Sequence, residues 1–412
     1  MTSALLTLER GPSEITLKRK GFAFLIILIT LGFSISFRNR DLGETNLDVQ
    51  NGVKLVFWLL IIGIAFFKIR TLTPLIASPS GYTLLILSIL ILASATWSER
   101  PLYSMACALG FTSYNALASM SLYEFSDDEF YQIICHSLLA FVGLGYITAI
   151  LYPETAWLPP SVEETYSRLQ GLAVNPNNFG RFAALLFLIS LGIWTKERRA
   201  SLTLLLSMSA GLIGMGLSGS RTALVASIFT ATFVSFRNHP LFRFAILSAI
   251  ILFTALLFFM SYGVTLNTVF RSLSRTGLES EVFTLTGRTD LWSTALEMIR
   301  ERPLFGWGFN STEEHFSLLF NQDFYGTPVN PHQMLLHLTL GVGTIGAVLA
   351  LIIIALRMKT IFTEPDALND MMILYILIYG LTEVDLFGTP LFTSLIFFRI
   401  SLKDAFTRRP VS

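Results

Sequence analysis

Twelve apolar runs constrain this chain more than any other feature of its sequence. They lie at about 21–37, 53–67, 81–97, 102–123, 130–152, 178–195, 201–217, 221–236, 241–261, 333–356, 370–387 and 389–403. A bilayer core needs roughly 20 apolar residues per helix, so these runs predict membrane-spanning helices. The sequence therefore predicts an all-α polytopic membrane protein, with residues 1–412 forming a single transmembrane domain. The second, eighth and last runs are short, so eleven spans remain an alternative to twelve.

The composition supports a membrane location. The chain is 53% hydrophobic and 14% charged, whereas soluble domains carry about 25% charged residues. A formal net charge of +1 gives no support for a nucleic-acid partner. Cys107 and Cys135 fall inside apolar runs, which argues against a disulfide framework. The first apolar run follows Lys18-Arg19-Lys20 and lacks a clear cleavage site, so we interpret it as a retained first span.

The positions of Lys and Arg indicate the orientation of the spans. Cytoplasmic loops carry an excess of these residues. If the N-terminus is cytoplasmic, the inside segments hold most of them, and both termini are cytoplasmic. These inside residues are Lys18, Arg19, Lys20, Lys68, Arg70, Lys196, Arg198, Arg199, Arg237, Arg243, Arg357, Lys359, Lys403, Arg408 and Arg409.

Two segments on the opposite, outer side are longer than simple connections. One is an outer loop at 153–177, and the other is a large loop at 262–331. Loops of this length are usually functional or disordered. The second loop contains an amphipathic helix at about 288–301, and we expect its apolar face to consist of Leu291, Trp292, Ala295, Leu296 and Ile299.

Two arginines lie at predicted helix starts on the outer side. Arg221 follows Ser218-Gly219-Ser220 at the start of the eighth span, and Arg288 follows Gly287 at the start of the loop helix. A helix N-terminus favours anions, and a guanidinium suits phosphate. Ser218 or Ser220 is expected to cap the eighth span. The alternatives are an interfacial arginine that reaches lipid headgroups at 221 and a solvated charge at 288.

Histidine is the candidate acid–base residue. His332 immediately precedes the tenth span at its outer end, and imidazole accepts protons near neutral pH. His337 has an equal claim from spacing alone, but His332 is favoured because a helix start at the interface is accessible to water. Arg168 and Asn177, at the end of the first outer loop, are candidates for contact with a polar substrate, although turn and cap residues explain most of that segment.

Other chemistry lacks sequence support. The chain has no P-loop and no GxGxxG pattern. Glu313-Glu314 and Glu383 with Asp385 are weak metal candidates because their spacing is unconvincing. We therefore expect no metal and no other cofactor.

Several segments, in this order, resemble the O-antigen ligase and polymerase family of bacterial envelope glycosyltransferases. The resemblance covers about residues 80–350. The matching stretches are Ala95-Thr96-Trp97-Ser98 with Pro101, Arg168-Leu169-Gln170-Gly171, Asn175-Pro176-Asn177, Ser220-Arg221-Thr222-Ala223-Leu224, Thr286-Gly287-Arg288-Thr289-Asp290-Leu291-Trp292, Arg302-Pro303-Leu304-Phe305-Gly306-Trp307-Gly308, and His332 with Leu336, Gly343 and Gly346. Gln333 departs from the family's His-Asn element, which affects the expected orientation of the substrate.

The resemblance implies a GT-C-like membrane glycosyltransferase of the bacterial inner membrane with a periplasmic active site. It implies transfer of a glycan from an undecaprenyl-diphosphate carrier to an acceptor hydroxyl, without metal or nucleotide. Arg221 and Arg288 match the family's diphosphate-binding arginines, and His332 matches its catalytic histidine. The implied partners are the lipid-linked donor, a lipid A-core or glycan acceptor, membrane lipid and other polysaccharide assembly proteins.

Three functions remain open at this stage. A ligase acts on lipid A-core, and a polymerase of the same family joins repeat units of O-antigen or exopolysaccharide. A lipid-linked oligosaccharide flippase would also have about twelve spans. Transport, however, requires polar residues along a path through the midplane, whereas here the unusual residues gather at one face.

Overall fold

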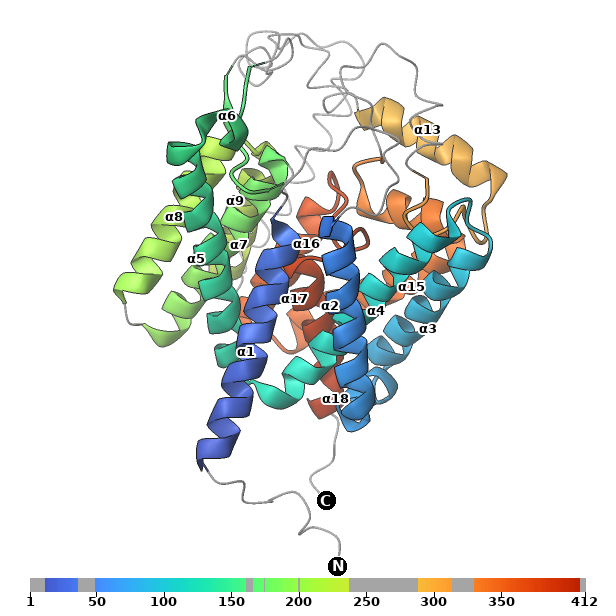
Figure 1. Cartoon of the computed structure of the whole chain (residues 1–412), viewed down its shortest axis with the longest axis horizontal. Coiled ribbons are helices and arrows are strands. Elements are labelled where there is room, and N and C mark those ends of the chain that lie inside the picture. Colours follow the sequence, from blue (N-terminus) through green and yellow to red (C-terminus); the bar gives the residue numbers. More distant parts are fainter. Residues whose placement is uncertain are drawn as a thin grey trace, which may run out of the picture.

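The computed structural model describes residues 12–35, 49–160, 166–173, 175–198, 201–236, 288–312 and 330–407. Over these residues the chain is a bundle of helices, with α13 lying across one end of it (Figure 1). The only exception to the predicted all-α fold within these ranges is a small antiparallel pair, β1 (Trp157–Leu158) and β2 (Arg168–Leu169). This pair lies in the predicted outer loop.

Most of the described chain is α-helical. The larger helices are α1 (Pro12–Ser34), α2 (Val49–Phe67), α3 (Pro79–Ala93), α4 (Pro101–Glu124), α5 (Asp127–Leu151), α7 (Pro176–Glu197), α8 (Leu202–Ser218), α9 (Arg221–Phe236), α13 (Arg288–Glu301), α15 (Met334–Thr363), α16 (Ala367–Tyr379) and α17 (Phe392–Leu402). Short helices complete it: η1 (Ile69–Ile76), η2 (Ser94–Thr96), α6 (Pro153–Ala156) and α18 (Asp404–Thr407).

The chain is a polytopic membrane protein. Five described helical stretches are long and apolar enough to cross a bilayer: Gln50–Phe67, Pro79–Thr96, Asp127–Leu151, Pro176–Glu197 and Met334–Thr363. Eleven of the twelve predicted spans overlap a described helix, and the span at 241–261 lies outside the described residues. The total of twelve spans stays a prediction.

The last two predicted spans differ from the helices in the structure. The runs at 370–387 and 389–403 contain α16, of 13 residues, and α17, of 11 residues. At 1.5 Å per residue these helices reach only about 20 and 16 Å, short of a bilayer core of about 30 Å. Every residue of α17 is buried. These runs are apolar because they pack inside the protein, and the irregular segment 380–391 joins them.

The long helix α15 is broken about one third of the way from its N-terminus. Val342 and Gly343 leave the helical conformation, and Gly343 has φ +70° and ψ −174°. The segment 303–308 fills the break with backbone hydrogen bonds. Trp307 N–H donates to the Leu340 carbonyl (2.8 Å), Gly308 N–H to that of Gly341 (2.9 Å), and Thr344 N–H to that of Pro303 (2.8 Å). We call segment 303–308 the clasp.

The stretch around Trp97, which also carries the family resemblance, holds the clasp in place. The Trp97 indole N–H donates to the Phe305 carbonyl (3.1 Å), and the two rings meet edge to face. Phe309 N–H donates to the Ser94 hydroxyl oxygen (3.0 Å). Two motifs that are about 200 residues apart in sequence therefore stabilise one structural element, the break in α15.

A substitution at Gly343 tests how closely the clasp approaches α15. Its backbone conformation is essentially restricted to glycine, and an added Cβ would overlap the carbonyl group of Leu304. We expect Gly343→Ala to destabilise the protein by at least about 1–3 kcal/mol, from backbone strain alone. Thermal unfolding of the detergent-purified protein measures this loss.

Gly63→Ala is the matched control. Gly63 lies in α2, where an added Cβ has no heavy atom within 4 Å, and alanine favours the helix. Its unfolding temperature should equal or exceed that of the unmodified protein. An unchanged unfolding temperature for Gly343→Ala would contradict the close approach of the clasp.

Candidate functional site

A chain of polar contacts joins three predicted site residues at one end of the bundle. The Arg168 guanidinium donates to the Asn177 side-chain oxygen (2.5 Å), and the Asn177 amide donates to Glu383 Oε1 (2.9 Å). The other carboxylate oxygen of Glu383 lies 3.3 Å from His332 Nδ1. Arg168, Asn177 and His332 therefore belong to one network, which we call the outer network, with Glu383 at its centre.

The outer network draws on elements that are far apart in sequence. Arg168 lies on β2, Asn177 in the first turn of α7, His332 just before α15, and Glu383 in segment 380–391. Met334 N–H donates to the Gly380 carbonyl (3.0 Å), and this bond ties the start of α15 to the end of α16. The fold thus brings together the His332 and Glu383 side chains.

The backbone at His332 has an unusual conformation. Its φ of +47° lies in the left-handed region, which is uncommon for residues other than glycine. The Asn330 side-chain oxygen accepts from His332 N–H (2.9 Å), and the Gln333 side chain caps α15 by accepting from Leu336 N–H (2.5 Å). The two neighbouring amides therefore fix the turn that presents the imidazole. Gln333, which replaces the asparagine of the family's His-Asn element, therefore has a structural role as the cap of α15.

His332 and His337 occupy different environments. The His332 side chain is 34% exposed and has a carboxylate partner. His337 is 7% exposed within α15, and its Nε2 lies 2.7 Å from the Asn310 side-chain oxygen. This geometry favours His332 as the histidine that can meet a substrate.

The start of α9 lies beside the outer network. Ser220 caps α9 by accepting from Ala223 N–H (3.4 Å), as predicted for one of the two serines. The Thr382 hydroxyl donates to that of Thr222 (3.2 Å), so α9 begins next to segment 380–391. Arg221, the first residue of α9, has an exposed side chain.

Helix α13 begins at Arg288 and lies against the His332 turn. The Trp292 indole N–H donates to the carbonyl of Pro331 (3.0 Å), the residue before His332. Arg288 precedes Trp292 by one helical turn, so its backbone belongs to the same region; its side chain lies outside the described residues. Met298 is buried on this helix and Leu296 is 47% exposed, so Leu296 does not belong to the packed face that the sequence pattern predicted.

Arg168 is buried to a degree that its sequence context did not reveal. Its residue is 4% exposed, and its Nε donates to the Ser218 carbonyl (2.8 Å) in addition to the bond to Asn177. Gly219, with φ +60°, allows this approach, since a Cβ there would lie 3.2 Å from the Arg168 Nε. The guanidinium links β2 to the turn between α8 and α9.

Glu383 is the residue that sequence reasoning considered only as a weak metal candidate. Its position in the sequence indicated a functional role, because a carboxylate inside a predicted membrane span costs free energy and is usually kept for function. Within the described residues, no group of three or more His, Cys, Asp or Glu is placed to hold a metal ion. Glu313-Glu314 lies outside them.

The fold and the outer network define a membrane-embedded protein with a paired imidazole and carboxylate at one end of its helical bundle. Residues 204–351 match the family model Wzy_C, described as O-antigen ligase. The predicted resemblance is confirmed over that stretch, which carries Arg221, Arg288 and His332. Members of this family are membrane glycosyltransferases of the ligase or polymerase type. A search of curated proteins found no match.

Loss of the guanidinium is expected to lower the stability of the protein at position 168 but not at position 221. Arg168→Met leaves the Ser218 carbonyl and the Asn177 side chain without a donor in a buried place, which costs about 1–3 kcal/mol of stability. Arg221→Met removes an exposed group, so its unfolding temperature should stay close to that of the unmodified protein. Thermal unfolding of both variants in one detergent makes the comparison, and equal effects would contradict a structural role for Arg168.

Proposed function

We propose that the chain transfers a glycan from an undecaprenyl-diphosphate carrier to an acceptor hydroxyl at the periplasmic face of the bacterial inner membrane. The acceptor that we propose is lipid A-core, which makes the protein an O-antigen ligase. The alternative is a polymerase of O-antigen or exopolysaccharide repeat units. The two reactions share their chemistry and differ in the acceptor.

The contact between His332 Nδ1 and Glu383 is the observation that supports this proposal most directly. A carboxylate at 3.3 Å favours the tautomer with the proton on Nδ1. The lone pair of the neutral ring then lies on Nε2, where it can accept the proton of a sugar hydroxyl. Glu383 also stabilises the imidazolium that forms, as acidic partners of catalytic histidines do.

The leaving group is the second requirement. As the bond from the anomeric carbon to the diphosphate oxygen breaks, negative charge grows on the diphosphate. Arg221, Arg288 and the starts of α9 and α13 supply positive groups that can stabilise this charge without a metal ion. Attack by the acceptor oxygen on the face opposite the leaving group inverts the anomeric centre.

Charges at the other end of the bundle support the orientation that we propose. Glu124, Asp127, Asp128 and Glu129 surround the connection from α4 to α5, and Lys and Arg residues pair with them. These partners are Arg19, Lys68, Lys196, Arg399 and Lys403. Because cations concentrate on the cytoplasmic side, we assign this end to the cytoplasm and the His332 end to the periplasm.

His332→Ala should lower kcat by about 10²–10⁴-fold, the usual contribution of acid–base catalysis, with little change in donor binding. Glu383→Gln should lower kcat less, because the imidazole remains. The assay follows transfer of lipid-linked glycan, extracted from a strain deleted for the chain, to acceptor from the same strain. Glycan transfer by His332→Ala at the unmodified rate would exclude the acid–base role.

Arg221→Lys and Arg288→Lys should weaken donor use, because lysine keeps the charge but lacks the planar fork of donors. The expected result is a lower kcat/KM for the donor, with an unfolding temperature equal to that of the unmodified protein. Arg300→Lys, near the C-terminus of α13, is the matched control and should leave the kinetics unchanged. Unmodified kinetics for both test variants would exclude diphosphate binding by these arginines.

The glycan profile of the deletion strain separates the two acceptors. A ligase predicts lipopolysaccharide without O-antigen and an accumulation of long carrier-linked chains. A polymerase predicts single repeat units in their place. Movement of unmodified lipid-linked glycan across vesicles, without joining to an acceptor, would indicate a flippase.

A further inference from the structure

We propose that Arg181 and Asp385 form a positioning pair that holds Glu383 in place against His332. This inference rests on the proposed function, because it concerns the geometry of the acid–base residue. Neither residue lies in the stretch that matches the family model. Among the described residues neither contacts His332 directly, and the proposed route to the imidazole runs through Glu383.

The pair is buried and joins α7 to segment 380–391. The Arg181 Nη1 lies 2.5 Å from Asp385 Oδ1, and the two side chains are 2% and 0% exposed. The same Asp385 oxygen accepts from the Thr393 hydroxyl (2.6 Å) in the first turn of α17. The Arg181 guanidinium also stacks 4.9 Å from the Phe182 ring centre and 5.8 Å from that of Tyr379.

This place in the chain lets the pair control Glu383. Asp385 follows Glu383 by two residues in an irregular segment, so no helical hydrogen bonds set the direction of the Glu383 side chain. Tyr379, at the end of α16, donates to the Asn177 carbonyl (3.0 Å), and Asn177 in turn donates to Glu383. Arg181 therefore fixes segment 380–391 against the same helix, α7, that supplies the second partner of Glu383.

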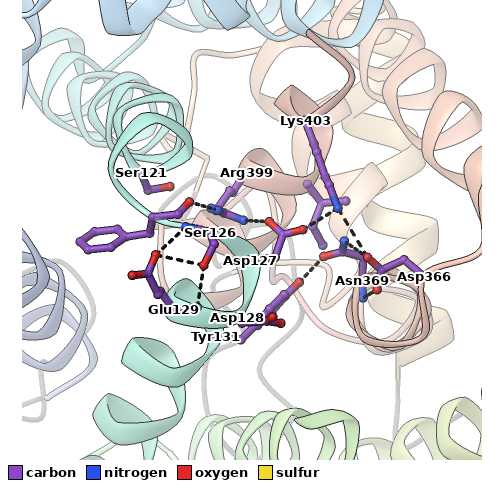
Figure 2. A network of polar contacts seen from close by, with 12 residues as sticks. Ser121, Ser126, Asp127, Asp128, Glu129, Tyr131, Asp366, Asn369, Arg399 and Lys403 are labelled. Atoms are coloured by element: carbon purple, nitrogen blue, oxygen red, sulfur yellow. Dashed lines mark hydrogen bonds and ion pairs between the residues drawn. The ribbon is translucent and has the colours of Figure 1, made fainter. Parts of the chain in front are cut away.

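The opposite ends of α16 and α17 are fixed by a separate network (Figure 2). Asp127, at the start of α5, binds both Arg399 and Lys403 at 2.5 Å, and the Tyr131 hydroxyl donates to Asn369 (2.6 Å). This cluster, which we call the inner network, lies at the end of α17 and the start of α16. The two short helices α16 and α17 are thus held by polar contacts at each end.

The alternative is a purely structural role, in which the Arg181–Asp385 pair only stabilises the fold. Removing one partner of a buried ion pair strongly destabilises a protein, whereas replacing both by apolar residues is often neutral. The double variant Arg181→Met with Asp385→Leu therefore separates the two roles. If the pair only stabilises the fold, this variant recovers both stability and activity.

If the pair positions Glu383, the double variant keeps the unmodified unfolding temperature but loses kcat. We expect a loss of up to about 10²-fold, the size that a misplacement of about 1 Å produces, no larger than the loss in Glu383→Gln and with an unchanged KM for the donor. Kinetics with extracted lipid-linked glycan, together with thermal unfolding, measure both. Unmodified kcat in a stably folded double variant would overturn the proposal.

Coupling to Glu383 provides the decisive measurement. In a Glu383→Gln background, adding the double change should lower kcat by less than about twofold, because residues that act through one group are not additive. Full additivity would overturn the proposal. Asp127→Asn, in the inner network, is the control for instability and should lower the unfolding temperature without changing kcat well below that temperature.

A readout without glycan transfer distinguishes failure of this inference from failure of the proposed function. Diethyl pyrocarbonate modifies the His332 imidazole, and peptide mass spectrometry gives the rate. The double variant and Glu383→Gln should share one rate that differs from that of the unmodified protein. A changed rate for Glu383→Gln with an unchanged rate for the double variant would overturn the inference, whichever reaction the protein catalyses.

Discussion

The structure depends on one constraint: where a helix of a membrane protein is broken, its freed backbone N–H and C=O groups need hydrogen-bond partners from the protein. Lipid offers no partners for N–H and C=O groups, so irregular backbone is tolerated only where protein covers it. The break at Val342 and Gly343 meets this condition because the clasp supplies the missing donors and acceptor. The clasp directly follows α13, and a separate hydrogen bond, from the Trp292 indole to the Pro331 carbonyl, ties α13 to the turn at His332.

Charges within the bundle follow a related rule. Isolated ionisable groups are costly inside a membrane protein, so they occur in pairs or at functional sites. Glu383 contacts Asn177 and His332, Asp385 contacts Arg181, and Asp127 contacts Arg399 and Lys403. Only the first of these groups includes a partly exposed imidazole. That difference distinguishes the Glu383 group, which is suited to acid–base chemistry, from the other two groups, which are suited to stabilising the fold.

Sequence patterns predicted the helices well, because the length and apolar character of a run directly reflect the solvent around it. They overestimated the length of the helices in the runs at 370–387 and 389–403, since residues buried in protein and residues facing lipid are equally apolar. His332 was recognisable from its position before a helix. Its partner Glu383 lies 51 residues away, and the burial of Arg168 depends on the Ser218 carbonyl. Such pairings arise from tertiary contacts that periodicity does not record.

The capping role of Gln333 has a consequence for how relatives of this chain are recognised. An amide at this position accepts a backbone N–H from Leu336, a task that asparagine, a favoured N-cap residue, also performs. A search pattern that demands asparagine after the histidine would therefore discard chains that build the same turn. The amide group, and not the length of the side chain, is the feature that such a pattern should require.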